Sequence, residues 1–337
     1  MYEKQLKDYI ERRNAGIIHE EFNVLTQEEG ELEERKHLLN RKRGVELIKS
    51  NVKGRMVSKT KIERQVHIMY MLHYELLQKQ REKLYLEERL ECRVAVFECG
   101  KMINDHEYVP AVHEETKEEE VLNDAVAFHV EDMEMKHQSI KRSQPFLFSH
   151  HLSPEPHFRT LDPQNQRGYR LPRETGSRYN RLEAVRYAEL WWNDYNPMYR
   201  KFTDNCTNFI SQCMHAGGAY FWGQSNRSKG WWYSPNTWSF SWSVAHSFRW
   251  YLSGSTKGLR GIEKSEAREL IPGDVICYDF DGDGRWQHNT IVVAKDFNGE
   301  PLVNAQTTNS RMRYWSYEDS SAYTPEIQYK FFRIVVD

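Results

Sequence analysis

The chain has 337 residues, 28% of them charged, and a formal net charge of −2. This length accommodates two domains with separate cores, and the near-neutral balance gives no electrostatic reason to expect a nucleic-acid partner. Nowhere does the sequence contain the roughly 20 consecutive apolar residues that a membrane-spanning helix needs.

The first residues of the chain, 1–14, are polar and charged and lack the apolar core of a signal peptide. This predicts a cytoplasmic protein, or a cell-wall-associated one if a leader has been removed. The five widely spaced cysteines form no disulfide framework, and no Cys/His spacing is that of a structural zinc site. We therefore expect free thiols, no metal and no cofactor.

Tryptophan divides the sequence more clearly than any other residue type. All ten tryptophans lie after position 190, whereas the first 140 residues are rich in Glu, Lys and Arg. The change predicts an N-terminal domain over 1–142, a loop-like linker over 143–177 and a C-terminal domain over 178–337.

The N-terminal domain is predicted to be a small α+β unit with an antiparallel sheet. Residues 28–48 fit a charged helix, and alternating apolar residues from Val66 to Tyr74 predict a strand with one buried face. Further strands are expected at Cys92–Phe97 and at Val126–Val130. The role of this domain stays open: it could recruit a partner, cover a cleft or bind a wall polymer.

The C-terminal domain is expected to begin with a helix over Tyr179–Trp192. A second helix is expected to start at or just after Cys206, because Asp204 and Asn205 are good N-cap residues, and to stop at the glycine pair 217–218. A cysteine at a helix N-terminus has its thiolate stabilised by the helix dipole. The free N–H groups there can also hold an oxyanion. We therefore expect a lowered thiol pKa.

A lone cysteine is more often a buried core residue than a nucleophile, so a catalytic interpretation needs a base. Val275–Tyr278 and Thr290–Ala294 fit two strands joined by a turn, and His288 stands at the start of the second strand. The turn, residues 279–284, imitates the start of a calcium loop, but position twelve would be Thr290 instead of Glu. A simple acidic turn is favoured.

Three blocks of sequence resemble the bacterial putative amidase domain family, which is related to CHAP and NlpC-type papain-like hydrolases. The blocks are YNRLEAVRYAELWW, CTNFISQCMHAGG, and PGDVICYDFDGDG followed by HNTIVV. The resemblance covers about residues 178–337 and implies a papain-like α+β fold with a helix packed on an antiparallel sheet. It also implies hydrolysis of amide bonds, typically in peptidoglycan peptides, with Cys206 as the nucleophile and His288 as the base.

A third polar residue that orients the histidine is expected on the next strand, Pro301–Thr307. Asn304 and Gln306 face the same side of that strand, and either amide oxygen could accept a hydrogen bond from the imidazole. The resemblance is incomplete here, because relatives commonly carry a histidine near the position of Gln306. They also often carry an aspartate in place of Asn205.

The tryptophan-rich segment 221–250 fits two interpretations. Core packing is favoured for the segment as a whole, whereas tryptophans in loop-like surroundings often stack on sugars or clamp peptides. At least one loop tryptophan is expected to line the cleft. The substrate-binding candidates are Trp222, Trp231, Trp238 and Asn205.

The leading prediction is a cysteine amidase or peptidase that cleaves a peptide or a peptidoglycan fragment through an acyl-enzyme. Two alternatives stay open. The first is a cell-wall- or protein-binding module that keeps the fold without the chemistry. The second is a cytoplasmic acyl-transferring or deamidating enzyme that uses the same Cys–His pair on a substrate other than the cell wall.

Overall fold

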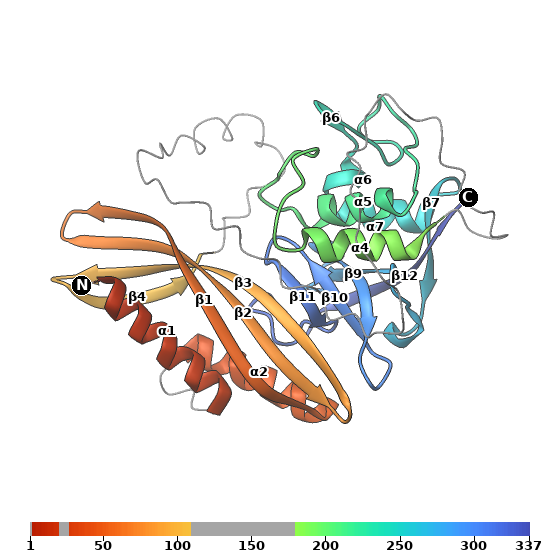
Figure 1. Cartoon of the computed structure of the whole chain (residues 1–337). Coiled ribbons are helices and arrows are strands. Elements are labelled where there is room, and N and C mark those ends of the chain that lie inside the picture. Colours follow the sequence, from red (N-terminus) through yellow and green to blue (C-terminus); the bar gives the residue numbers. More distant parts are fainter. Residues whose placement is uncertain (1, 20–26, 109–178) are drawn as a thin grey trace, which may run out of the picture. The chain divides into compact units, whose positions relative to one another are not determined.

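The computed structural model describes residues 2–19, 27–108 and 179–337, which form a mixed α+β structure (Figure 1). The predicted fold class is confirmed at this level. The expected strand at Val126–Val130 and the expected linker 143–177 lie outside the described residues.

The main element is a ten-stranded antiparallel sheet. Its strands are β1 (Val45–Ile62), β2 (Gln65–Gln80), β3 (Lys83–Glu98), β4 (Lys101–Glu107), β7 (Leu259–Lys264), β8 (Val275–Asp279), β9 (His288–Lys295), β10 (Pro301–Ala305), β11 (Ser310–Tyr314) and β12 (Gln328–Val336). They follow one another in the order β1-β2-β3-β11-β10-β9-β8-β12-β7, and β4 pairs with β3 outside this path. The short strands β5 (Tyr233–Ser234) and β6 (Thr237–Trp238) form a separate pair.

The helices include both that were expected in the C-terminal domain. Within the described ranges they are α1 (Tyr2–His19), α2 (Gln27–Arg43), α4 (Arg181–Trp191), α5 (Cys206–Ala216), α6 (Phe240–Ser243), α7 (Ala245–Gly254) and the 3₁₀ turn η2 (Ala267–Glu269). The charged helix expected over 28–48 ends earlier, at Arg43, because Gly44 adopts a left-handed φ of 71° and β1 begins directly after it. Neither α1 nor β1 was predicted, since their many charged residues obscure the apolar period.

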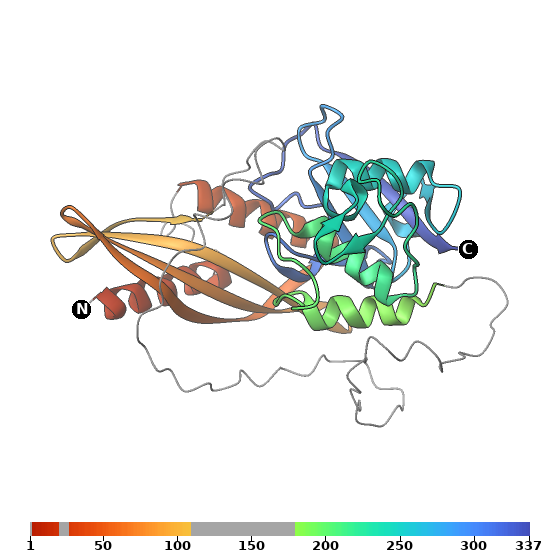
Figure 2. The same cartoon turned by 90° about the horizontal axis from the view of Figure 1, so that it is seen from above.

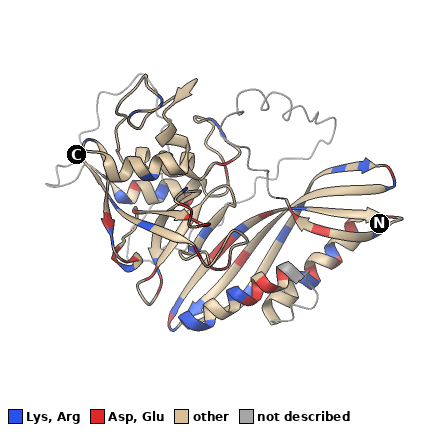
Figure 3. Cartoon of the chain, turned by 180° about the vertical axis from the view of Figure 1, so that it is seen from behind, with Lys and Arg blue, Asp and Glu red and all other residues tan. Residues whose placement is uncertain are grey.

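The N-terminal elements pack around a core between α1 and β2. The expected alternation in β2 is confirmed, since Ile68, Tyr70 and Leu72 are buried and belong to one apolar cluster with Leu6 and Ile17 of α1. Charged residues of both signs lie along α2 and the long strands (Figure 3). A buried ion network, made by Arg13, Arg89 and Arg93 with Glu29, Glu33, Glu91 and Asp105, lies beside the core. Because a buried charge needs an opposite partner, this network restricts how the two helices sit on the strands.

The C-terminal part places α4, α5 and α7 on one face of the sheet (Figures 1 and 2). Strand β9 shows how the two faces differ. Ile291 and Val293 belong to the core on the helix side, whereas Val292 belongs to a second cluster with Tyr278 and Tyr317. Neighbouring residues of a strand point to opposite faces, so β9 has one face under α5 and one face in this aromatic cluster.

The N-terminal and C-terminal strands belong to the same sheet. Strand β3 pairs with β11, with Arg89 opposite Ser310 and Glu88 opposite Arg311. The Arg311 guanidinium also bonds Glu88 at 2.6 Å and Glu189 of α4 at 2.7 Å. The change in composition between the halves of the chain is therefore not accompanied by a break in the sheet.

Candidate active site

Cys206 is the first residue of α5, and only 3% of its surface is exposed. Every residue from Cys206 to Met214 is buried, which makes α5 a core helix. The sulfur lies 4.0 Å from the carbonyl oxygen of Gln287, directly before β9. The predicted helix start is confirmed, and all five cysteines are free thiols as expected.

His288 is the first residue of β9 and is 8% exposed. Its Nε2 lies 3.2 Å from the hydroxyl of Tyr317. The imidazole also packs beside the rings of Tyr278 and Phe280, with centroid separations of 5.6 and 6.1 Å. The ring is thus held in the aromatic cluster, and its Nε2 is hydrogen-bonded to the Tyr317 hydroxyl.

The two residues lie where the first turn of α5 meets the start of β9. The side-chain amide of Asn289, next to His288, donates to the hydroxyl of Thr207, next to Cys206, at 2.8 Å. The main-chain N–H of Asn289 also bonds the Cys206 sulfur. The contact between helix and strand is therefore made by the chain neighbours of both predicted residues, whereas the His288 ring itself lies in the aromatic cluster.

The main-chain N–H groups at the start of α5 are bound by a residue distant in sequence. The hydroxyl of Thr307 accepts from the N–H of Asn205 at 3.0 Å and from the N–H of Cys206 at 3.2 Å. The predicted local cap by Asp204 or Asn205 is wrong, because the N-cap residue is Asn205 and its side chain makes no capping bond. Thr307 has a φ of 86°, which strains a β-branched residue by roughly 1–3 kcal/mol.

Burial sets the protonation of the candidate pair. Burial raises the pKa of the Cys206 thiol, against weaker hydrogen bonds that lower it. Burial, helped by the charge of Arg313, lowers the pKa of His288 to about 3. At neutral pH the pair is therefore a thiol and a neutral imidazole. The expected lowered thiol pKa is wrong for this closed arrangement, because loss of solvation outweighs the helix dipole.

Asn304 connects elements other than the candidate pair. Its amide nitrogen donates to Glu189 of α4 at 2.8 Å, and its amide oxygen accepts from the N–H of Met312 at 2.9 Å. The group at His288 Nε2 is instead the Tyr317 hydroxyl. No spacing or periodicity in the sequence links these two residues, since Tyr317 lies in a turn with a left-handed φ of 58°.

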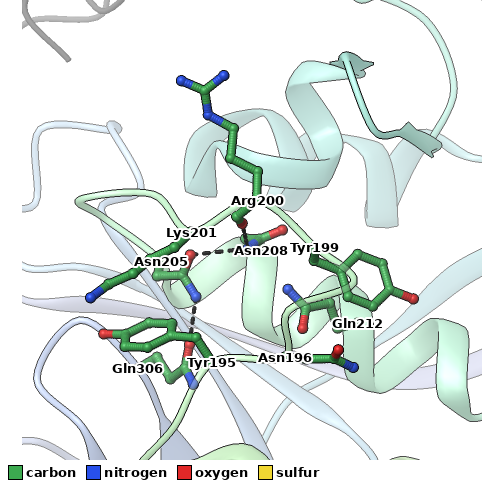
Figure 4. Close-up of a pocket in the computed structure, with 9 residues that line it drawn as sticks. All are labelled: Tyr195, Asn196, Tyr199, Arg200, Lys201, Asn205, Asn208, Gln212 and Gln306. Atoms are coloured by element: carbon green, nitrogen blue, oxygen red, sulfur yellow. Dashed lines mark hydrogen bonds between the residues drawn. The ribbon is translucent and has the colours of Figure 1, made fainter. Parts of the chain in front are cut away.

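Gln306 belongs to an amide-rich hollow beside the N-terminus of α5, whose nine lining residues are labelled in Figure 4. Its side-chain oxygen accepts from Asn205, and its nitrogen donates to the carbonyl oxygens of Trp191 and Asp194 at 2.6 and 2.8 Å. The side chain of Asn205 also accepts from Asn208 at 3.0 Å. The hollow has no interior room for a water molecule. These amides therefore fix the segment that leads into α5.

The three candidate tryptophans have different surroundings. Trp231 is fully buried and donates from Nε1 to the hydroxyl of Ser211 at 3.0 Å. Its assignment to substrate binding is wrong, because it packs inside the core. Trp238 is half-buried against Phe202, with 4.9 Å between ring centroids, close to the N-terminus of α5. Trp222 is 45% exposed and follows the C-terminal end of the same helix.

One group of side chains has the composition of a metal site. Ligand atoms of His73, Glu75 and Glu88 lie within 4.8 Å of one another. Both carboxylates already have a cation as partner, Glu75 with Lys53 at 2.6 Å and Glu88 with Arg311 at 2.6 Å. Because these ion pairs neutralise the carboxylates, the group does not indicate a metal site.

The acidic turn after β8 is a hydrogen-bonded turn, as expected. The buried carboxylate of Asp279 accepts from the N–H groups of Gly282 and Gly284 at 2.9 and 2.7 Å. Its oxygens are thus used within the turn.

Comparison with known proteins gives the class of the protein. Residues 178–332 match the family described as "Putative amidase domain", and the chain belongs to this family, as the sequence blocks indicated. Over 307 residues it is 44% identical to "Uncharacterized protein YhbB" of Bacillus subtilis (strain 168), an alignment that covers 90% of this chain and 86% of the relative. No solved structure gives a significant match. Within the described ranges, no helix has both the length and the hydropathy to cross a bilayer.

Proposed function

We propose that the chain is a cysteine-dependent amide hydrolase in which Cys206 is the nucleophile and His288 the base. The observation that supports the proposal is the contact between the first turn of α5, which begins with Cys206, and the start of β9, which begins with His288. Packing of α5 on the sheet also supports a papain-like arrangement of helix and strands.

The base in this proposal acts through Nδ1, because Nε2 is engaged by the Tyr317 hydroxyl. A proton on Nε2, donated to the tyrosine oxygen, leaves the Nδ1 lone pair free to take the proton of the Cys206 thiol. The thiolate then attacks the amide carbonyl carbon, and the imidazolium protonates the leaving amine as the C–N bond breaks. Water, deprotonated by the same imidazole, hydrolyses the thioester to a carboxylic acid and restores the thiol.

Tyr317 takes the positioning role that was expected of Asn304 or Gln306. Its hydroxyl fixes the ring orientation and the tautomer of His288, which is the task of the third member of a catalytic triad. The Arg313 guanidinium lies 4.0 Å from the centroid of the Tyr317 ring and bonds Asp319 at 2.8 Å. Tyr317 is thus held through the face of its ring as well as through its hydroxyl.

Catalysis requires the closed site to open. The N–H of Cys206 is the natural donor to an oxyanion formed at the attacked carbon, but it is bonded to the Thr307 hydroxyl. A substrate oxygen therefore has to replace that hydroxyl. Thr307 is exposed, and its backbone is strained. Moving Thr307 away from the Cys206 N–H therefore costs little free energy, because the movement releases that strain.

We propose a peptide amide, in peptidoglycan or a related cell-wall polymer, as the substrate. This rests on the family to which residues 178–332 belong and on the resemblance of its sequence blocks to cell-wall hydrolases. Incubation of the whole protein with purified sacculi, followed by mass spectrometry of released fragments, identifies the bond.

The decisive comparison is Cys206→Ala against Cys213→Ala, which removes another buried thiol from the same helix. Hydrolysis should be abolished in the first variant and kept in the second. Equal hydrolysis by Cys206→Ala and the wild type would refute the proposal.

The alternative function is a binding module that has kept the fold without the chemistry. The burial of both groups favours it, since the Cys206 thiol pKa is raised and the His288 pKa is lowered to about 3. In that case the wild type sediments with sacculi and releases no fragment. Residue-specific alkylation separates the cases further, because a nucleophile that opens with substrate becomes reactive near neutral pH when substrate is present.

A further inference from the structure

A pocket opens beyond the end of α5 that is remote from Cys206. It is lined by Trp222 and Gly230 from the segment after α5, and by Tyr251 and residues 254–257 at the end of α7. Its volume is about 350 Å³, within the range of about 300–1,000 Å³ that suits small ligands. The 11 residues of α5 span roughly 16 Å at 1.5 Å per residue, so this pocket is distinct from the candidate active site.

The main chain of Trp222 is held in place, although the residue is 45% exposed. Its main chain forms a two-bond bridge with the fully buried Trp231, at 2.9 and 2.8 Å. Glycines flank this bridge because no other residue fits: Gly223 and Gly230 have φ of 82° and 71°, and a Cβ on Gly230 would lie 1.9 Å from the Trp222 carbonyl oxygen. An exposed indole gains little from burial, so its fixed position indicates a platform for a ligand ring.

The remaining lining is polar and carries positive charge. Ser255 and Thr256 bring hydroxyl groups, and the Lys257 ammonium lies 5.2 Å from the centroid of the Trp222 ring. Tyr251 is half-buried at the same wall. Hydrogen-bonding groups therefore surround an exposed indole that already has a cation over one face of its ring.

We propose that this pocket binds a saccharide, with one sugar ring stacked on Trp222 and its hydroxyl or carboxylate groups bound by residues 255–257. A pyranose has an apolar C–H face that packs on an indole and a rim of hydroxyls that need hydrogen-bond partners. An extended peptide would need free main-chain groups along a strand edge, and those of Trp222 are used in the bridge to Trp231. This recognition does not depend on the chemistry of Cys206.

Isothermal titration of the whole protein tests the site with two probes, neutral chitotetraose and acidic tetragalacturonate. The wild type should bind at least one with a Kd in the millimolar range or below, and Trp222→Ala should weaken that binding about ten-fold or more. Trp250→Ala is the matched control, since Trp250 is 55% exposed on α7 and outside the pocket lining. It should leave the Kd unchanged. Lys257→Ala should weaken the acidic probe more than the neutral one.

Two results overturn this inference: no binding of either probe at about 10 mM, or the same Kd for Trp222→Ala and the wild type. Thermal melting shows that each variant is folded. Cys206→Ala should bind the probes like the wild type, and Trp222→Ala should keep the wild-type alkylation rate of Cys206. A failure of the saccharide site is thereby distinguishable from a failure of the proposed hydrolase.

Discussion

The two ends of α5 offer opposite surfaces to a ligand. At the N-terminal end, Cys206 and His288 are buried, and the strained Thr307 occupies the N–H groups that a reaction would need. Beyond the C-terminal end, Trp222 stands exposed in an open pocket. The open pocket at Trp222 can take up a ligand in the present conformation. Bond cleavage at Cys206 needs a different, more open conformation, because that site is closed to solvent.

Removal of the proposed base, His288, should have the largest effect on hydrolysis at the buried N-terminal end of α5. His288→Ala should lower the rate of hydrolysis by about 10²–10⁴-fold, the usual contribution of a positioned general base. Initial rates on sacculi measure the loss. His106→Ala, on an exposed residue of β4, should retain the wild-type rate, and an equal loss in both variants would remove His288 from the mechanism.

Acid pH should destabilise the closed end. The folded-state pKa of His288, about 3, lies below the ordinary value of 6.5, so between these values the unfolded chain binds a proton that the folded chain does not. The free energy of unfolding should therefore fall as pH drops from 6.5 towards 3, by up to about 1.4 kcal/mol per unit. Urea denaturation of the wild type and His288→Gln measures it, and parallel pH profiles would contradict the prediction.

Loss of the tyrosine hydroxyl should loosen His288 without removing it. Tyr317→Phe deletes one hydrogen bond, worth about 1 kcal/mol, so kcat should fall about five- to ten-fold while KM stays unchanged. The acid limb of the pH–rate profile should shift as well. Tyr329→Phe is the matched control, because its hydroxyl, in the same cluster, donates to the carbonyl oxygen of Ser316. A proportional rise in KM would assign Tyr317 to substrate binding instead.

The smallest expected effect is that of Thr307→Gly, which should make the Cys206 end of α5 more accessible, as the Trp222 end already is. Thr307→Gly removes the hydroxyl from the N–H of Cys206 and relieves the strain of the positive φ, so alkylation of Cys206 should quicken about three-fold. Peptide-resolved mass spectrometry follows the thiol. Thr308→Gly, at the adjacent exposed position, serves as the control. Slower alkylation of Thr307→Gly would mean that Thr307 supports the reactive state.

The parts of the site that follow from local chemistry were predictable from the sequence. A helix that starts at Cys206 and stops at the glycine pair needs only its own apolar spacing and end signals. The strand at His288 needs only alternation after a turn. These local patterns therefore indicate Cys206 and His288 as candidates. The prediction that the two residues act together relies on the family resemblance.

The remaining contacts depend on tertiary structure that leaves no local pattern. Tyr317 and Thr307 reach the site from turns with positive φ, a conformation that neither residue type signals. The thiol pKa was misjudged because the helix dipole is readable from sequence, whereas burial is not. Trp231 was misassigned for the same reason, since buried and exposed tryptophans look alike in a glycine-rich segment.

The pairing of β3 with β11 has a consequence for any fragment of this protein. The family match begins at residue 178, so a fragment cut there would keep β11 and lose the strand that covers its edge. Arg311 would also lose its ion pair with Glu88. An uncovered strand edge is a template for association with other chains, so the isolated fragment should be aggregation-prone. The boundary of the family match is therefore a poor guide to the smallest fragment that stays unaggregated.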